Sequence, residues 1–310
     1  MTIRYDRPVS RAAFLARRLG LFGLVMFVMA AMAHRFGTMT TPSLIALMIL
    51  SALLGGLAVL LALGGLYALW SEGARGGKAA TAALFMAAIP LLPPAFAIMP
   101  FFTRPAIHDI TTDIDDPPSY LVEPPAEQGW LPARAAVGAQ DRMAQKLAYP
   151  GLTGRRYDGA LDRVLAAVRK VADSQGIVID RDEGAPAPLF ELEAPSGKPE
   201  KGVDKDNPDA PVSDSPDVVP VPLPRPEPDL AGNEAFAGKP GEVVIQGHVT
   251  SLVFGFRSEV VIRLREEAET TLVDMRITSR YGAHDLGAGD RTIEAYLKAL
   301  DAELLGIAGD

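Results

Sequence analysis

The chain has 310 residues, of which 48% are hydrophobic, and it carries 26 prolines and a formal net charge of −8. These features are segregated, because residues 1–102 have a net charge of +6 whereas residues 103–310 have a net charge of −14. A basic apolar segment followed by an acidic polar one is typical of a membrane anchor joined to a water-exposed domain. The acidic part argues against a nucleic acid as partner. The absence of cysteine excludes thiolate metal sites, disulfides and a cysteine nucleophile.

Three apolar stretches predict three transmembrane helices. They are Leu19–Ala33, Leu44–Trp70 and Ala79–Ile98, and no Asp, Glu, Lys or Arg interrupts them. The second and third have the roughly 20 residues that span a bilayer, and the first reaches this length if its flanking arginines extend to the interface. The first also ends in a small-x-small sequence, so a cleaved signal peptide is the alternative to an uncleaved span. The prolines of the third stretch predict a kink or an early helix end.

The distribution of Lys and Arg predicts the orientation. Seven of them lie in residues 1–18 and in the second short loop, against two in the first loop and after the third span. Positive charge favours the cytoplasmic side, which places the N-terminus there and the C-terminal domain on the other side. We therefore expect a multi-pass anchor at 1–102, with the lipid bilayer as its partner, and an extracytoplasmic α+β domain at 103–310.

Prolines recur through residues 103–156, which predicts an extended and mostly irregular segment with a short possible strand at Ala106–Thr111. This segment holds a cluster of one histidine and four aspartates: His108, Asp109, Asp113, Asp115 and Asp116. Their spacing lacks the order of a calcium-binding loop, and we interpret them as a solvated turn rather than a metal site.

Periodicity predicts the elements of the domain. Apolar residues at helical spacing indicate an amphipathic helix at about 158–174, followed by a short strand at 177–180. Residues 186–240 contain 13 prolines, so we expect a disordered, Pro-rich insertion at about 184–240. Strand-like runs follow at 242–254, 259–265 and 271–281, and then a closing helix with Asp285 or Asp290 as its N-cap. This order favours an antiparallel four-stranded sheet with two helices on one face.

Alternation in the strands suggests a candidate ligand-binding face. Val273, Met275 and Ile277 point one way, so the polar residues between them share the other face. The same division in the neighbouring strand predicts a basic patch of Arg263, Arg265, Arg276 and Arg280. Arginine suits carboxylate or phosphate groups. The alternative is a solvated face on which Asp274 and Glu259 neutralise these charges.

Motifs of catalysis and of cofactor binding are missing from the sequence. We therefore assign no catalytic residue, cofactor or metal. His284 and Asp285 are adjacent in a turn, and an acid/base pair there is the alternative to a structural ion pair between Arg280 and Asp285.

Three segments together resemble the domain of unknown function 1499 family: Val253–Arg263, Val273–Gly287 and Ile107–Asp113. The resemblance covers about residues 105–182 and 241–304. The chain departs from the family pattern at Ile277, at Ser258-Glu259 and at Gly289-Asp290. The resemblance implies a membrane-associated or exported bacterial domain and gives no activity to carry over.

These observations favour a noncatalytic binding or interaction module of the cell envelope, anchored in the bacterial inner membrane. Its partner would be an anionic envelope ligand or another membrane protein. The alternative is a hydrolase that acts on an anionic envelope substrate through His284, Asp285 and the arginines. A concave pocket that joins these residues would favour the enzyme, and a flat open sheet the binding module.

Overall fold

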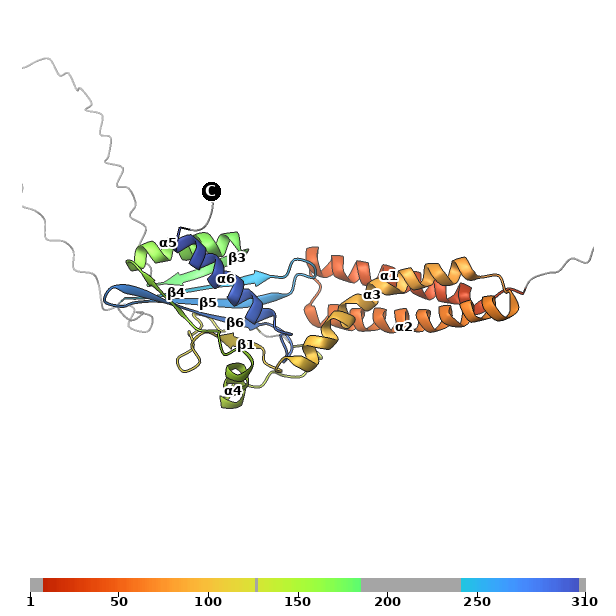
Figure 1. Ribbon diagram of the computed structural model, residues 1–310, viewed down its shortest axis with the longest axis horizontal. Helices are drawn as coiled ribbons and strands as arrows, with labels where there is room; N and C mark the ends of the chain where they lie inside the picture. The colour runs from red at the N-terminus through yellow and green to blue at the C-terminus, as the bar shows by residue number, and fades with distance from the viewer. Residues whose placement is uncertain (1–7, 126–127, 185–240, 307–310) are drawn as a thin grey trace, which may run out of the picture.

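The computed structural model describes residues 8–125, 128–184 and 241–306, and its long helices and its sheet lie end to end (Figure 1). The three helices are α1 (Arg11–Phe36), α2 (Thr41–Glu72) and α3 (Gly77–Thr103), and each is long and apolar enough to cross a membrane. The three helices expected from hydropathy are therefore confirmed.

Small side chains bring these helices close together. A Cβ atom added to Gly65 of α2 would lie 2.8 Å from the Cβ of Ala13 in α1, and one added to Gly20 of α1 would lie 3.2 Å from the carbonyl oxygen of Ala83 in α3. Close approach of this kind is the usual way in which apolar helices associate in a membrane. The three helices of this one chain therefore pack directly against one another.

The prolines of α3 do not end the helix. Pro90, Pro93, Pro94 and Pro100 all lie inside it, and it continues to Thr103. Of the two expected outcomes, a kink or an early end, the early end is wrong, because neighbouring helices can support a helix in which proline removes a backbone hydrogen bond. The continued helix carries the chain directly to the sheet (Figure 1).

The sheet has six antiparallel strands instead of the expected four. They are β1 (Asp109–Thr111), β2 (Arg155–Asp158), β3 (Ile177–Glu183), β4 (Glu242–Thr250), β5 (Arg257–Glu266) and β6 (Thr270–Ser279). Their order is β1-β6-β5-β4-β3, and β2 also pairs with β6. Strand β1 lies within the short possible strand expected at Ala106–Thr111. Strand β2 has four residues, too few for a clear alternation, and both strands pair with the same edge of β6.

Two helices cover one face of this sheet, as expected (Figure 1). They are α5 (Leu161–Ser174) and α6 (Ala288–Leu304), and their apolar sides form one core with the inward residues of the strands. Val168, Ile262, Met275 and Tyr296 are among its fully buried side chains. Burial of these apolar side chains away from water is the main force that holds the helices against the sheet.

The opposite face is also covered, so the alternative of a solvated face is wrong about exposure, although Asp274 and Glu259 do pair with the arginines as that alternative expected. The chain between β1 and β2 crosses it and includes α4 (Ala139–Ala148), on the side of the sheet away from α5 and α6 (Figure 1). Gln246 of β4 fixes this covering segment, because its side chain accepts hydrogen bonds from the backbone N–H groups of Leu121 and Val122 and donates one to the carbonyl of Val122. Polar residues on this face are therefore enclosed.

The described residues also include Gly184, at the edge of the expected Pro-rich insertion. The rest of that insertion, residues 185–240, lies outside the part of the chain that the structure describes, and its expected disorder stays a prediction.

Candidate functional site

The polar face of β5 and β6 brings the predicted arginines together. In the sheet register, Arg263 lies opposite Asp274 and Arg276 lies opposite Val261, so their side chains share a face with Arg265. Arg280 follows β6 directly, and its guanidinium donates hydrogen bonds to Glu259 on the same face. The predicted grouping is present, but the arginines are paired with carboxylates instead of forming an open basic surface.

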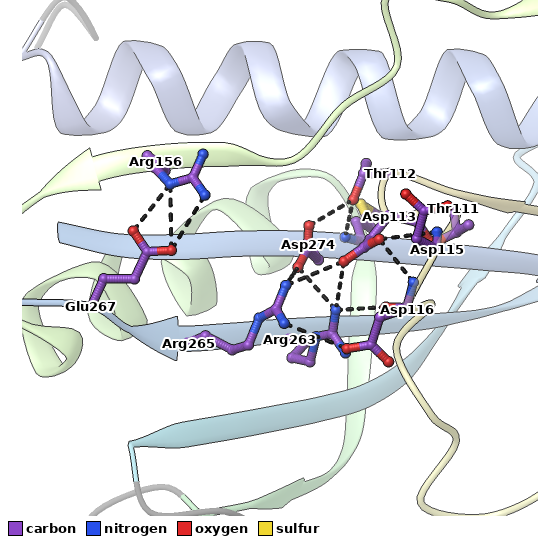
Figure 2. Close-up of polar contacts among 11 residues, drawn as sticks. Thr111, Thr112, Asp113, Asp115, Asp116, Arg156, Arg263, Arg265, Glu267 and Asp274 are labelled. Atoms are coloured by element: carbon purple, nitrogen blue, oxygen red, sulfur yellow. Dashed lines mark hydrogen bonds and ion pairs between the residues drawn. The ribbon is translucent and has the colours of Figure 1, made fainter. Parts of the chain in front are cut away.

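Arg263 and Arg265 form the first of two ion-pair clusters (Figure 2). Their guanidinium groups both contact Asp274, at 3.1 Å in each case, and Asp113, at 3.1 and 3.2 Å. Arg263 also pairs with Asp116 at 3.0 Å, and its side chain is only 5% exposed. This cluster fastens the start of the covering segment to the sheet, so these two arginines have their charges satisfied within the protein.

Asp109 is the centre of the second cluster. Its carboxylate accepts hydrogen bonds from Arg276, with the shortest at 2.7 Å, from Arg142 at 3.1 Å and from the hydroxyl of Thr278 at 2.9 Å. Burial by itself raises the pKa of Asp109, but the hydrogen bonds and charges of Arg276 and Arg142 hold this pKa below its ordinary value. Asp109 is therefore a buried, ionised residue, which corrects the interpretation from the sequence for this residue. Asp115 and Asp116 are exposed as expected, in a turn in which the Asp113 side chain accepts hydrogen bonds from their backbone N–H groups.

A cavity of about 690 Å³ lies beside Asp109, between the sheet and the covering segment. Arg276 and Thr278 of β6 line it together with residues on the covering segment and α4. Its ionisable lining residues are His108, Asp109, Tyr120, Glu123, Arg134, Arg142 and Arg276. A concave site with several convergent polar groups is the usual form of a small-molecule site.

Arg134 differs from the other arginines of the cavity. It donates a hydrogen bond to the carbonyl oxygen of Ser279, and no carboxylate lies within 4.0 Å of it among residues 8–125, 128–184 and 241–306. Burial lowers the pKa of Arg134, although a guanidinium stays charged at any physiological pH. The cavity wall thus presents a positive charge that an anion could neutralise.

His108 provides a second polar group in the same wall. Burial lowers the pKa of His108, and the nearby charge of Arg134 lowers it further. The imidazole is therefore neutral at pH 7, since its ordinary pKa is already about 6.5. A neutral ring beside a cation can donate one hydrogen bond and accept another.

The candidate acid/base residues lie elsewhere. Asp285 accepts hydrogen bonds from the N–H groups of Gly287 and Gly289, both at 2.9 Å, while His284 accepts one from Leu286 through Nδ1 and stacks on Phe101. Neither residue lines the cavity, and no hydrogen bond joins the two side chains in the described structure. The expected Arg280–Asp285 ion pair is also wrong, because Arg280 pairs with Glu259.

Within the described ranges, no group of three or more His, Cys, Asp or Glu residues is arranged to hold a metal ion. Sequence reasoning missed the functional potential of Arg134, Arg142 and Tyr120. The sequence offered one indication of these residues, the predicted polar face of the sheet. If such a face is covered by another segment, that segment must supply hydrogen-bond partners for it. Nothing in the local sequence identifies which residues those partners are.

Residues 229–300 match the family described as "Protein of unknown function (DUF1499)". This match confirms the family resemblance over the segment that includes β4, β5, β6 and most of α6. No curated protein and no solved structure matches the chain.

Proposed function

We propose that this protein is a membrane-anchored binding module of the bacterial cell envelope, whose sheet domain lies outside the cytoplasm and takes a small anion in the cavity beside Arg134. The observation that carries the proposal is the positive charge of Arg134 in a cavity wall where the neighbouring arginines are already paired. A carboxylate or a phosphate would accept hydrogen bonds from its planar guanidinium. Neutral His108 could add a further hydrogen bond to the same group.

The anchor supports the location proposed for the domain. Backbone hydrogen bonds between Ser10 and Arg75 and between Arg75 and Pro8 join the N-terminus to the α2–α3 loop, at the end of the bundle away from the sheet. That end also holds most of the positive residues of the first third, which favours its placement in the cytoplasm. The sheet domain then faces the other side of the membrane.

Binding is better supported than hydrolysis. The predicted acid/base residues, His284 and Asp285, are separated from the cavity, and Asp109 has its oxygens occupied by Arg276 and Arg142. A general base needs a lone pair that can reach its substrate. The alternative of a hydrolase acting on an anionic envelope substrate would therefore have to rest on other ionisable residues of the cavity, such as His108 and Glu123.

Isothermal titration of the full-length protein in detergent micelles tests this proposal, with inorganic phosphate and acetate as probes. Replacement Arg134→Gln should weaken binding by about 1.5–3 kcal/mol, or roughly tenfold to a hundredfold in Kd, because one charged hydrogen-bonding group is lost. The matched control is Arg156→Gln, which removes an arginine that pairs with Glu267 on the surface (Figure 2). Neither residue lines the cavity. Equal affinities of the Arg134→Gln variant and the unaltered protein would contradict the proposal.

A further inference from the structure

We infer that the loop between β4 and β5 is a second membrane-contacting element, whose tip, Leu252 and Val253, lies among the acyl chains of the leaflet beneath the sheet domain. The partner is the lipid bilayer itself. This inference is independent of the cavity and of its ligand, and it depends only on α1, α2 and α3 spanning a membrane.

The loop has a fixed shape. The N–H of Ser251 donates to the carbonyl of Phe256 at 2.8 Å, and the N–H of Gly255 donates to the carbonyl of Ser251 at 3.0 Å. Gly255 has a φ of +76°, and a Cβ atom at this position would lie 3.2 Å from Cδ of Arg35. The backbone conformation and the close approach to α1 both favour glycine.

Contacts with α1 bring the loop beside a membrane helix. The carbonyl oxygen of Phe254 lies 2.6 Å from Nδ1 of His34, and the ring of Phe254 packs edge to face against the ring of Phe27 at 6.1 Å. Phe27 lies nine residues before the end of α1 at Phe36, which corresponds to about 13 Å along the helix axis. The side chain of Phe254 therefore contacts a residue within the predicted membrane span.

The tip of the loop is apolar and uncovered by protein. The exposed fraction is 90% for Leu252 and 72% for Val253, the residues that immediately precede Phe254. Two adjacent apolar side chains with this exposure are unfavourable in water, whereas lipid next to the helix would cover them. Continuity with the membrane-spanning surface of α1 identifies this lipid as the occupant.

Four exposed aromatic side chains lie at the same end of the helix bundle as the loop. They are Phe36 at the end of α1, Phe101 and Phe102 at the end of α3, and Trp130 of the covering segment. The indole N–H of Trp130 donates to the carbonyl of Pro42 at the start of α2, at 2.9 Å. Trp is enriched where a bilayer meets water, so the contact of Trp130 with Pro42 places this boundary at the same end of the bundle, and the loop reaches from there to Phe27 in the predicted span.

Single cysteines provide a direct test, because the chain has no cysteine of its own. We would label Leu252→Cys and Val253→Cys with an environment-sensitive fluorophore in the full-length protein, reconstituted in phosphatidylcholine–phosphatidylglycerol nanodiscs. The matched control is Ala268→Cys, an exposed residue in the turn between β5 and β6, at the opposite end of these strands. The two tip labels should be quenched severalfold more by spin-labelled lipid than by aqueous iodide, and the control label should show the reverse.

Two results would overturn the inference. Iodide quenching of the tip labels as strong as that of the label at residue 268 would place the loop in water. Protection of the tip labels from both quenchers would mean that protein covers them, which in a purified sample is a second copy of this chain.

Discussion

At the scale of single residues, the polar face of the sheet uses arginine in two different ways. Arg276 forms a buried ion pair with Asp109 through several hydrogen bonds. Arg134 instead donates to a backbone carbonyl and forms no ion pair with a carboxylate in the described part of the chain. The first arrangement stabilises the fold, because each charge satisfies the other. The second leaves a charge for a ligand. The same residue type therefore has a structural role in one position and a proposed binding role in another.

The buried Asp109 predicts a large effect on stability. Replacement Asp109→Asn should lower the free energy of unfolding by about 3–5 kcal/mol at pH 7, because Arg276 and Arg142 lose their buried partner. Denaturant unfolding of the full-length protein in micelles measures this change. The control is Asp115→Asn, because Asp115 is exposed and takes part in no ion pair with a described residue. A change at Asp109 as small as that at Asp115 would contradict a structural role.

The pH dependence of stability follows from the same group. Because the pKa of Asp109 is lower in the folded protein than its ordinary value of about 3.9, its contribution is fully present above pH 4 and is lost as the pH falls through the folded-state pKa. The unaltered protein should therefore lose stability more steeply below pH 4 than the Asp109→Asn variant does. Parallel pH profiles of the two proteins would show that another group carries this dependence.

At the scale of elements, short segments are held by side chains as much as by backbone pairing. Strand β1 has three residues, yet its Asp109 and the following Asp113 are each fixed by arginines of neighbouring strands. Helix α6 begins after Gly287, which has a φ of +70°, so neither Asp285 nor Asp290 is its N-cap residue as expected. Asp285 nevertheless satisfies two N–H groups at the start of this helix, which is the role of a capping side chain.

This geometry predicts the effect of removing the cap. Replacement Asp285→Ala should destabilise the protein by about 1 kcal/mol, because the N–H groups of Gly287 and Gly289 lose their acceptor. Arg291→Ala, at an exposed position of the same helix, should change stability by less than about 0.5 kcal/mol. Denaturant midpoints of the two variants provide the comparison. A reversed order would mean that the carboxylate is not a cap.

At the scale of the whole molecule, the anchor and the domain are joined by more than the chain itself. Arg104, just after α3, pairs with Asp290 of α6 at 2.8 Å, and the β4–β5 loop contacts His34 of α1. Together with the Trp130–Pro42 hydrogen bond, these contacts hold the sheet directly against one end of the helix bundle. The distribution of charge along the sequence then predicts on which side of the membrane this end lies.

A reporter fused after Asp310 tests that orientation. Alkaline phosphatase is active only outside the cytoplasm, so its fusion should be active and a fusion of a cytoplasm-dependent fluorescent protein should be dark, because the positive residues lie at the opposite end of the helices. Fusions within the α2–α3 loop should give the opposite pattern. A dark phosphatase fusion after Asp310 would reverse the proposed location of the domain.

The sequence alone determined the features that depend on local periodicity. Uninterrupted apolar stretches predicted α1, α2 and α3, helical spacing of apolar residues predicted α5 and α6, and alternation predicted β5 and β6 and the shared face of their arginines. Each of these patterns is repeated over at least two turns or several strand residues. The family resemblance likewise depends on contiguous motifs, and it was confirmed over residues 229–300.

Only the tertiary structure decided what covers that face and where the candidate site lies. Asp109 and Arg276 are 167 positions apart, and the cavity joins residues from β1, the covering segment, α4 and β6. The sequence indicated a short possible strand at Ala106–Thr111 but not that β1 pairs with β6, and β2 is too short to show a pattern. The segment between β1 and β2 packs through individual polar contacts that have no period. Because a buried charge must find a partner wherever the chain can supply one, its partner is set by three-dimensional packing and not by nearby sequence.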